Sequence, residues 1–338
     1  MDGVVDIIRN QFPEKKILVV GDMVADQFLR GSISRVSREA PVFILRHENT
    51  ETLGGGAANA ASNVAALDGQ AFLVGVAGND ANGRALTKTL SANGVNLKGV
   101  VISDSFETTT KLRVLAGQQY ARRQQVIRID YENTVPIDEE SVEALGTKSL
   151  MMMENVDAVI VSDYGYGVVT EELFLKIKRR ADQSGIPVIV DSRSRLDQFS
   201  GATAATPNKE EVEQLLKAAY SPEACKVLRE RLGLEALLVT LGNKGMFLTV
   251  EKGNSEIIPI VGKDEPVDVT GAGDTVIATF ALGVASKAGF LTSARIANHA
   301  GGAVVMKKGT ATLTAEELIE SISKYEPELA AASLQQAT

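Results

Sequence analysis

The feature that most constrains the fold of this chain is the alternation of short apolar runs with longer helical patterns. Runs rich in Val, Ile and Leu lie at Ile17–Val20, Ala71–Val76, Ala158–Val161, Pro187–Val190 and Ala236–Val239. Continuous apolar runs of this length suit strands that are buried on both faces of a parallel sheet. Helical patterns lie between them, at Ala57–Leu67, Gly83–Asn93, Glu171–Ser184, Lys209–Ala219, Pro222–Leu232 and Ala272–Lys287. The alternation predicts an open α/β fold with helices covering a parallel sheet.

Two segments depart from this alternation, at residues 27–51 and 98–131. They contain few helical patterns, and Val42–Arg46 and Gln125–Ile129 are typical of strands. We expect them to form a small second sheet outside the main one that could serve as a lid, although ordinary surface hairpins fit the same pattern. Residues 1–330 are then predicted to form one domain, followed by a disordered tail at 331–338.

Composition excludes several classes of function. The net charge is −8 with no basic block, which argues against binding to nucleic acid or to an anionic membrane. A single cysteine, Cys225, allows neither an intramolecular disulfide nor a cysteine-rich zinc site, and the two histidines form no metalloprotease motif. The longest apolar stretch, Val276–Ala285, is too short to span a membrane. With no recognisable signal peptide, the expected location is the cytoplasm.

The motif that points most strongly to chemistry is Asp268-Val-Thr-Gly-Ala-Gly-Asp274-Thr, which runs directly into an apolar helix. The amides of Gly271, Ala272 and Gly273 would open that helix, where unpaired N–H groups and the helix dipole favour an anion. Asp274 could then accept a proton from a hydroxyl group while the amides hold charge on a phosphoryl group. The alternative interpretation is a tight turn with Asp274 as a helix cap.

Polar residues that follow other apolar runs would gather at the same edge of the sheet, where open α/β folds bind ligands. Asp22 and Asp26 could accept hydrogen bonds from sugar hydroxyls, and Asp163 closes another run. Gly55 and Gly56 precede Asn59, whose amide is both donor and acceptor. Each signal has a structural alternative, since acids at strand ends and glycine-rich turns are common.

Two further motifs suit a nucleotide and its metal ion. Asn208 and Glu211 lie three residues apart on one helix face, which suits a hydrated Mg²⁺ or, equally, a capping box. Thr240, Gly242 and Gly245 could hold a phosphate, or could form a plain hairpin loop. The sequence contains no Walker A motif, no dinucleotide fingerprint after a strand and no protein-kinase catalytic loop. Phosphoryl transfer would therefore need another scaffold, and an NAD-dependent oxidoreductase is disfavoured.

Taken together, these strings resemble the PfkB (ribokinase-like) carbohydrate kinase family from about Ile17 to Leu313. The resemblance rests on Gly55-Gly56-x-x-Asn59, on Gly75-Val-Ala-Gly78-Asn-Asp80-x-x-Gly83 and on Asp268–Asp274. It implies a Rossmann-like, three-layer α/β domain with a small β-sheet lid, ATP as phosphoryl donor, Mg²⁺, and a homodimer formed through the lid. Its implied roles are a catalytic base (Asp274), an anion hole (Gly271, Ala272, Gly273), Mg²⁺ and phosphate ligands (Asn208, Glu211), a nucleotide loop (Thr240, Gly242, Gly245), an adenine pocket (Asn298) and a K⁺ site (Asp268, Thr270).

Within that family, several strings look like the kinase half of D-glycero-β-D-manno-heptose 7-phosphate kinases. They are Gly21–Asp26, Ser34–Val42, Thr110–Val114 and Ser162–Tyr164. Such enzymes phosphorylate the anomeric hydroxyl and give the 1,7-bisphosphate, a lipopolysaccharide precursor. The resemblance implies contacts to the sugar from Asp22, Asp26, Gly55, Gly56, Asn59 and Asp163, and to the distal phosphate from Arg35, Lys111 and Arg113.

The sequence departs from the heptose kinase pattern at two places. Tyr166 stands where that subfamily usually has Lys, and Asp191-Ser192-Arg193-Ser194 stands where it reads Asp-Pro-Lys-Gly. We expect Arg193 to replace the lysine near the nucleotide phosphates, although Arg and Lys differ in geometry. The alternatives that stay open are a related kinase for ribose, fructose or a nucleoside, and a non-catalytic sensor of a sugar or nucleotide.

Overall fold

The computed structural model describes residues 3–117, 124–133, 135–262 and 265–331, and its central element is an eight-stranded sheet. The strand order is β14-β13-β12-β11-β10-β9-β1-β4. The strands are β1 (Lys16–Gly21), β4 (Gln70–Val74), β9 (Ala158–Asp163), β10 (Val188–Ser192), β11 (Ala204–Ala205), β12 (Ala236–Thr240), β13 (Met246–Val250) and β14 (Glu256–Ile258). Pairing is parallel from β4 to β12, but β13 and β14 are antiparallel. The sheet is therefore mixed, because the short turn after β12 leaves no room for a crossover helix.

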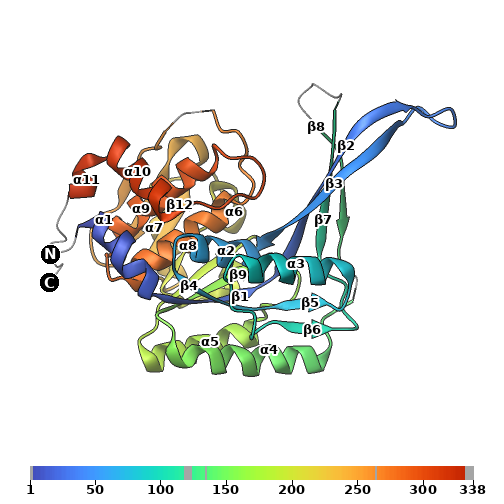
Figure 1. Cartoon of the computed structure of the whole chain (residues 1–338). Coiled ribbons are helices and arrows are strands. Elements are labelled where there is room, and N and C mark those ends of the chain that lie inside the picture. The colour runs from blue at the N-terminus through green and yellow to red at the C-terminus, as the bar shows by residue number, and fades with distance from the viewer. Residues whose placement is uncertain (1–2, 118–123, 134, 263–264, 332–338) are drawn as a thin grey trace.

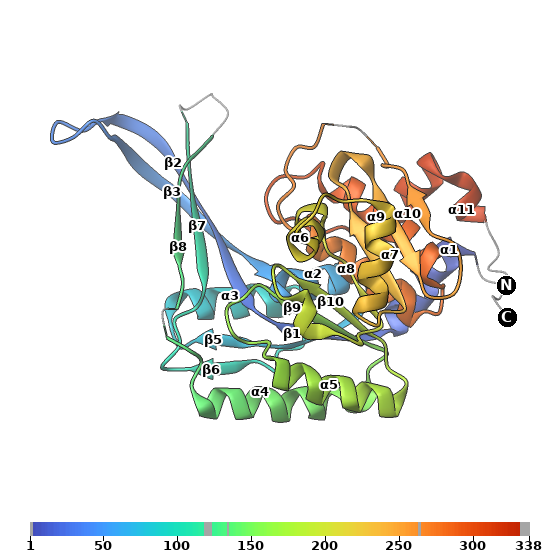
Figure 2. The same cartoon turned by 180° about the vertical axis from the view of Figure 1, so that it is seen from behind.

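Helices cover both faces of this sheet, which confirms the three-layer α/β prediction (Figures 1 and 2). Ile17 and Val19 of β1 enter one core cluster, whereas Leu18 and Val20 enter the other. The first cluster packs under α2 (Ala57–Ala66), α8 (Ala272–Ala285), α9 (Phe290–Val304) and α10 (Ala315–Tyr325). The second packs under α4 (Glu139–Met152), α5 (Glu171–Ser184), α6 (Lys209–Leu216) and α7 (Pro222–Arg231). Short helices α1 (Val4–Asp6) and α11 (Pro327–Ala331) contact each other near the chain ends.

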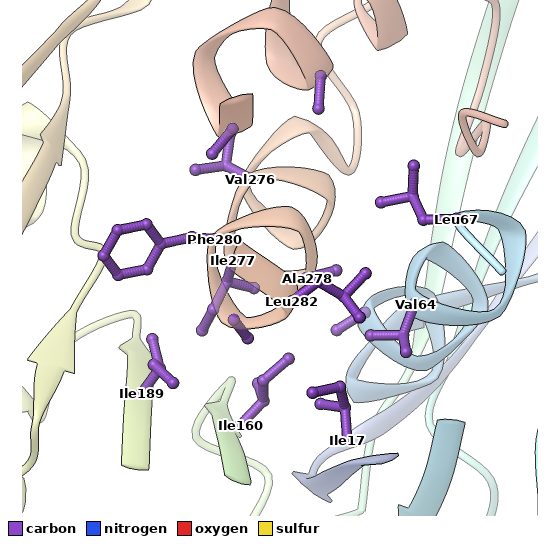
Figure 3. Close-up of a cluster of buried hydrophobic side chains, with 14 of the residues drawn as sticks. Ile17, Val64, Leu67, Ile160, Ile189, Val276, Ile277, Ala278, Phe280 and Leu282 are labelled. Atoms are coloured by element: carbon purple, nitrogen blue, oxygen red, sulfur yellow. The ribbon is translucent and has the colours of Figure 1, made fainter. Parts of the chain in front are cut away.

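Helix α8 lies in the middle of the first cluster. Its side chains, among them Ile277 and Phe280, pack against Ile160 and Ile189 of the sheet and beside Val64 of α2 (Figure 3). The apolar stretch of the sequence is thus a buried helix, as predicted, and its first turn is fixed at the edge of the sheet. No helix in the described part of the chain has the length and apolar character needed to cross a bilayer.

A second, four-stranded sheet projects from this body, with the order β3-β2-β7-β8 (Figure 1). It consists of β2 (Met23–Val36), β3 (Phe43–Gly56), β7 (Thr110–Gly117) and β8 (Gln124–Tyr131). We call it the projecting sheet. The strands predicted at Val42–Arg46 and Gln125–Ile129 lie largely within β3 and β8, so the expected second sheet is present rather than isolated hairpins. It begins at Met23, two residues after the end of β1, rather than at residue 27.

The glycine-rich string around Asp80 anchors the base of the projecting sheet. Asp80 caps α3 (Ala81–Ala92) by accepting a hydrogen bond from the Gly83 amide (2.7 Å), and it accepts a second from the Thr108 amide (2.8 Å). A Cβ on Gly78 would lie 2.3 Å from the Phe106 carbonyl oxygen, so only glycine fits there. Two short strands, β5 (Val76–Gly78) and β6 (Val101–Ser103), pair beside it.

Several boundaries differ from the sequence predictions. The run Ala71–Val76 is divided at Gly75 between β4 and β5, and α6 ends at Leu216 because Lys217 adopts a left-handed conformation (φ 51°). Helices α4, α9 and α10 were not predicted, since their apolar patterns are interrupted by small and polar residues. Of the predicted disordered tail, residues 332–338 lie outside the described residues.

Candidate active site

The candidate site lies at the carboxyl edge of the sheet, where the loops after β1, β9, β10 and β12 meet. Asp22 directly follows β1, Asp163 ends β9 and Thr240 ends β12. The register brings the ends of β1, β9 and β10 side by side, with Gly21 opposite Ser162 and Ser192 opposite Asp163. The predicted gathering of polar residues at this edge is therefore present.

Asp274 lies in the first turn of α8, next to the opening amides of that helix. Gly271 precedes the helix with φ 77°, and a Cβ there would lie 2.5 Å from the side-chain nitrogen (Nδ2) of Asn59. Glycine is thus required both by the left-handed turn and by the close approach of α2. Gly271 and Ala272 are partly buried and Gly273 is exposed. The Ala272 amide donates to the Val269 carbonyl oxygen (3.3 Å), so Gly273 is the exposed residue of the first turn at which an amide could meet an anion.

The Asp274 carboxylate is 2% exposed and is held by two donors from different elements. Asn59 of α2 donates to Oδ2 (2.8 Å), and the hydroxyl of Tyr164, in the loop after β9, donates to Oδ1 (2.9 Å). Burial raises the pKa of Asp274 to about 7, and the two hydrogen bonds offset part of that rise. A carboxylate with a pKa near neutrality suits a general base. Tyr164 was missed in the sequence, although its position directly after Asp163 marks it as an edge residue.

Asp22 is a buried anchor of the loop after β9. Its carboxylate accepts hydrogen bonds from the amides of Tyr164 (2.8 Å), Tyr166 (3.0 Å) and Val168 (3.0 Å). Burial raises its pKa despite these three bonds. Its backbone oxygen also accepts from the Ala57 amide (3.0 Å), the first residue of α2. With 1% exposure, Asp22 has little surface left for the sugar contact that the sequence suggested.

Asp163 is likewise occupied within the protein. Its carboxylate pairs with the Arg195 guanidinium and accepts from the Ser192 hydroxyl (2.7 Å), and it is 1% exposed. Neither partner was predicted, because nothing in the sequence links them to a residue 29 or more positions away. Asp163 therefore orders the loops at the ends of β9 and β10 rather than presenting free oxygens.

A polar cavity of about 1330 Å³ lies between the projecting sheet and the body. Asn59 and Thr270 line its floor, and Arg113 of β7 lines its wall. Behind Arg113, Asp26 pairs with its guanidinium (2.6 Å) and accepts from the hydroxyl of Thr310 (3.0 Å). The glycine string lies beneath these groups. A Cβ on Gly55 would come within 2.8 Å of the Asp26 carboxylate, and one on Gly56 within 2.6 Å of the Asp22 carbonyl oxygen.

Two cations lie near this cavity on neighbouring tyrosine rings. The Lys111 ammonium is 5.6 Å from the centre of the Tyr166 ring, and the Arg193 guanidinium is 5.0 Å from the centre of the Tyr164 ring. Burial lowers the pKa of Lys111, and the nearby Arg193 charge lowers it further. Neither side chain forms an ion pair with a described acidic residue. Such cations can receive an anionic ligand.

Arg35 is not brought to this site. It lies near the outer end of β2, opposite Ile44, and is exposed. Arg35 lies nine residue steps along the strand from Asp26, a length of about 30 Å at ~3.3 Å per residue. The projecting hairpin points away from α8 in both views (Figures 1 and 2). Arg35 therefore cannot join Lys111 and Arg113 within one chain.

A second, smaller cavity of about 200 Å³ lies on the other side of the α8 N-terminus. Four of the predicted nucleotide residues line it, together with two of the anion-hole residues; they are Thr240, Gly242, Gly245, Asn298, Ala272 and Gly273. Met246, Val276 and Val305 make much of its wall apolar. Gly245 has φ 83°, and a Cβ there would lie 2.1 Å from the Ile258 carbonyl oxygen. The cavity suits a flat apolar ring with its polar tail directed to α8.

Asn208 and Glu211 form the capping box that was the structural alternative. The Asn208 side chain accepts from the Glu211 amide (2.9 Å), and the Glu211 carboxylate accepts from the Asn208 amide (2.8 Å). Burial raises the pKa of Glu211. Burial and the nearby charges of Glu211 and Asp274 also raise the pKa of Asp191, at the end of β10. No set of three acids, histidines or cysteines in the described ranges could hold a bare metal ion. The carboxylates of Glu211 and Asp191 fit a hydrated Mg²⁺ that also contacts phosphates.

Asp268 ties the loop before α8 to residue 309. It accepts from the amides of Thr270 (3.0 Å) and Gly309 (2.9 Å). Burial would raise the pKa of Asp268, but these hydrogen bonds outweigh it and keep the pKa below its usual range.

Comparison with known proteins decides the family. The model of the pfkB family carbohydrate kinases matches residues 14–317. This chain belongs to the pfkB carbohydrate kinase family. It is an ATP-dependent carbohydrate kinase with the ribokinase-like fold.

Curated relatives and solved structures agree with this assignment. The chain is 41% identical to the bifunctional protein HldE of Shewanella piezotolerans over 92% of its length and 64% of that protein, and 38% identical to HldE of Desulfatibacillum aliphaticivorans over 91% and 63%. The chain thus spans just under two thirds of these relatives. Similar folds include Arabidopsis thaliana ribokinase with ribose and ATP (21% identity, TM-score 0.68, 91% of this chain and 98% of that one) and Escherichia coli phosphofructokinase-2 with potassium (19%, 0.72, 93% and 99%).

Proposed function

We propose that this kinase transfers the γ-phosphoryl group of ATP to the anomeric hydroxyl of D-glycero-β-D-manno-heptose 7-phosphate, giving the 1,7-bisphosphate. The observation that carries the proposal is the place of Asp274, between a polar cavity lined by Asn59 and Arg113 and a small cavity lined by Thr240 and Asn298. The strings shared with heptose kinases, and the similarity to HldE proteins, support the choice of heptose.

In the proposed reaction, the sugar hydroxyl oxygen attacks the γ-phosphorus. A new O–P bond forms, the bond to the ADP oxygen breaks with its electron pair going to ADP, and the hydroxyl proton passes to the Asp274 carboxylate. The amides of Gly271, Ala272 and Gly273 and the α8 dipole stabilise negative charge on the transferring group. Asn59, which lines the polar cavity, donates to one carboxylate oxygen of Asp274 and thereby connects the base to that cavity.

Mg²⁺ supplies charge neutralisation on the nucleotide phosphates in this scheme. Glu211 and Asp191 would contact it through water, because their carboxylates carry no ion pair in the described structure and their pKa values are raised. A K⁺ ion beside Asp268 and Thr270 is the corresponding proposal for the monovalent cation. Its test is turnover in K⁺ against turnover in a tetraalkylammonium salt at equal ionic strength.

The distal phosphate of the sugar is assigned to Lys111, with Arg113 beside it on the same face of β7. Arg113 is already paired with Asp26, whereas its neighbour Lys111 forms no ion pair with a described acidic residue and can take a new partner. Arg193 lies near Asp274 and Asp191 and is assigned to the transferring phosphate. This arrangement compensates for the absence of the lysine that Tyr166 replaces.

A substrate panel tests this assignment. Coupled ADP release is measured with D-glycero-β-D-manno-heptose 7-phosphate, the unphosphorylated heptose, ribose, fructose, fructose 6-phosphate and adenosine. We expect the heptose 7-phosphate to give the highest kcat/KM by at least tenfold. Higher activity on an unphosphorylated sugar or a nucleoside would replace heptose 7-phosphate as the substrate while leaving the kinase family intact.

We further propose that the projecting sheet closes over the sugar as a lid and pairs with that of a second copy. Its outer face exposes Ile127 and Ile129, and its tip exposes Val36, Val42 and Phe43. Apolar groups in such number favour burial against another surface. Sedimentation should give a dimer for the native chain and a monomer for Ile127→Glu; a native monomer at micromolar concentration would contradict the pairing.

A further inference from the structure

The hydroxyl of Tyr164 donates to the same carboxylate that the proposed mechanism uses as its base. The distance from Tyr164 Oη to Asp274 Oδ1 is 2.9 Å, and Asn59 holds the other oxygen at 2.8 Å. Both donors favour the ionised form of a carboxyl group that burial pushes toward its neutral form. Without one of them, the free energy of ionising Asp274 would rise.

Tyr164 is itself fixed from two sides. Its amide donates to the Asp22 carboxylate (2.8 Å), and the Arg193 guanidinium lies 5.0 Å from the centre of its ring. The ring packs close to Gly56, where a Cβ would meet Cδ2 at 3.3 Å. Burial and the nearby Asp274 charge raise the Tyr164 pKa well above 10, so the hydroxyl stays protonated and keeps donating.

Asp22 connects both donors of Asp274 to the end of β1. Its carboxylate holds the loop that carries Tyr164, and its backbone oxygen holds the Ala57 amide at the start of α2, which carries Asn59. A single buried residue thereby sets the relative position of the two groups that hold the carboxylate.

We propose that Tyr164 is a positioning residue that keeps Asp274 ionised and oriented, and that Asp22 acts on Asp274 through Tyr164 and Asn59 rather than by contacting the sugar. The inference rests on Asp274 being the base of the proposed reaction. The alternative that the test must distinguish is a plug, in which the Tyr164 hydroxyl on Asp274 blocks the acceptor hydroxyl.

The decisive variant is Tyr164→Phe, which removes the donor and keeps the ring. Loss of a charge-assisted hydrogen bond should raise the apparent pKa of the acid limb of kcat/KM by about one to two pH units. The rate should therefore fall by tenfold or more at pH 6, with a much smaller loss at pH 9. An equal loss at every pH would indicate a merely structural role, and a lower KM for the sugar would indicate a plug. Either result overturns the proposal.

Tyr166→Phe is the matched control, since it makes the same change two residues away in the same loop. Its hydroxyl donates to Glu132 (3.0 Å) and not to Asp274, so the apparent pKa of the acid limb should not move. A shift equal to that of Tyr164→Phe would contradict the assignment.

A direct titration separates this proposal from the kinase proposal itself. Protein labelled with ¹³C at the aspartate carboxyl carbon is titrated without substrates, and the Asp274 signal is identified by its loss in Asp274→Asn. In Tyr164→Phe the midpoint of that signal should rise by about one to two pH units. An unchanged midpoint would refute the role of Tyr164 whether or not the chain phosphorylates heptose.

The role of Asp22 is tested in the same titration. Asp22→Asn replaces one acceptor oxygen by an amino group and should release the loop, shifting the Asp274 midpoint upward. In the Tyr164→Phe background that shift should shrink by more than half. Full additivity of the two shifts would show that Asp22 acts by another route, and a folded Asp22→Asn with no shift would refute the coupling.

Discussion

The two cavities near Asp274 differ in chemistry although they are close together in the chain: Thr270, just before α8, lines the large one, and Ala272 and Gly273, at the start of α8, line the small one. The small one is lined by backbone, glycines and apolar side chains, whereas the large one is lined by charged and amide side chains from the projecting sheet and α2. The backbone and glycines of the small cavity can accommodate an aromatic base and phosphates bound to backbone amides. This lining offers few side chains that would distinguish one such ligand from another. Side chains such as Arg113 and Lys111 distinguish ligands by charge. The difference indicates that donor binding depends on backbone shape and acceptor choice depends on side chains.

The sharpest way to break this comparison is to fill the small cavity without disturbing the fold. A Cβ on Gly273 would meet no atom within 4 Å, yet this residue lines the cavity beside the opening amides of α8. We expect Gly273→Val to lower kcat/KM for ATP by about 10²–10³-fold, because the methyl groups block phosphates from the amides. Binding of the sugar phosphate, measured by calorimetry without nucleotide, should change less than threefold.

Gly146→Val is the control for that substitution. It lies within α4, and a Cβ there also meets nothing within 4 Å. Both variants replace a helical glycine by valine, so a similar loss of activity in Gly146→Val would mean that the Gly273 effect comes from the change within a helix and not from the cavity.

The next largest effect should come from the acceptor side. Lys111→Met removes a buried ammonium with no ion pair among the described residues, so stability should hold. We expect KM for the heptose 7-phosphate to rise by about 10–100-fold, the loss expected for a contact to a charged group. KM for ATP should stay constant. A similar rise for the unphosphorylated heptose would show that Lys111 does not read the distal phosphate.

Much of this division could be predicted from the sequence, because glycine motifs and strand-end acids are local signals. Five of the residues that line the small cavity, and the helix that carries Asp274, were identified in that way; they are Thr240, Gly242, Gly245, Ala272 and Gly273. Asn298, which also lines it, was implied by the family resemblance alone. Asp22 and Asp163 were assigned to the sugar, but the structure surrounds them with amides, Ser192 and Arg195. Such partners are set by how distant loops fold back on one another, which local patterns do not encode.

The same limit explains Tyr164 and Arg35. Tyr164 owes its place to a hydrogen bond that spans 110 residues, so no local pattern could pair it with Asp274. Arg35 lies in a motif that resembles the heptose kinases, but the length of β2 carries it away from the site. Similarity of a short motif does not determine the length of the strand that carries it, and hence not its distance from the site.

The raised pKa of Asp274 gives a pH dependence that is smaller but direct. The base must be ionised, so kcat/KM should decrease about tenfold per pH unit below a pH of about 7. The same carboxyl group has the opposite effect on the free energy of unfolding, which it increases at low pH rather than at high pH. The pKa of this carboxyl group is higher in the folded chain than in the unfolded chain. Its protonated form therefore stabilises the native state at pH values below the unfolded-state pKa of about 4, and that contribution is lost as the pH rises toward 7. Asp274→Asn should therefore be more stable than the native chain by about 1–3 kcal/mol at pH 8, and not at pH 4, in urea unfolding.

The smallest change in turnover is expected for a substitution at Arg195, which lines neither cavity. Arg195→Met leaves the buried Asp163 carboxylate without its guanidinium and should lower the free energy of unfolding by about 2–3 kcal/mol. Turnover at 15 °C, with the variant still folded, should fall less than tenfold. A loss of more than a hundredfold in folded enzyme would place Asp163 or Arg195 in direct contact with a substrate.

The claim at the centre of this account is that Asp274 takes the acceptor proton at the junction of the two cavities. Single-turnover phosphoryl transfer from ATP to the heptose 7-phosphate tests it most directly, in Asp274→Asn with ATP affinity measured beside it. We expect transfer to slow by about 10²–10⁴-fold with ATP affinity within threefold of the native chain. Transfer at near-native rates in Asp274→Asn would contradict the account.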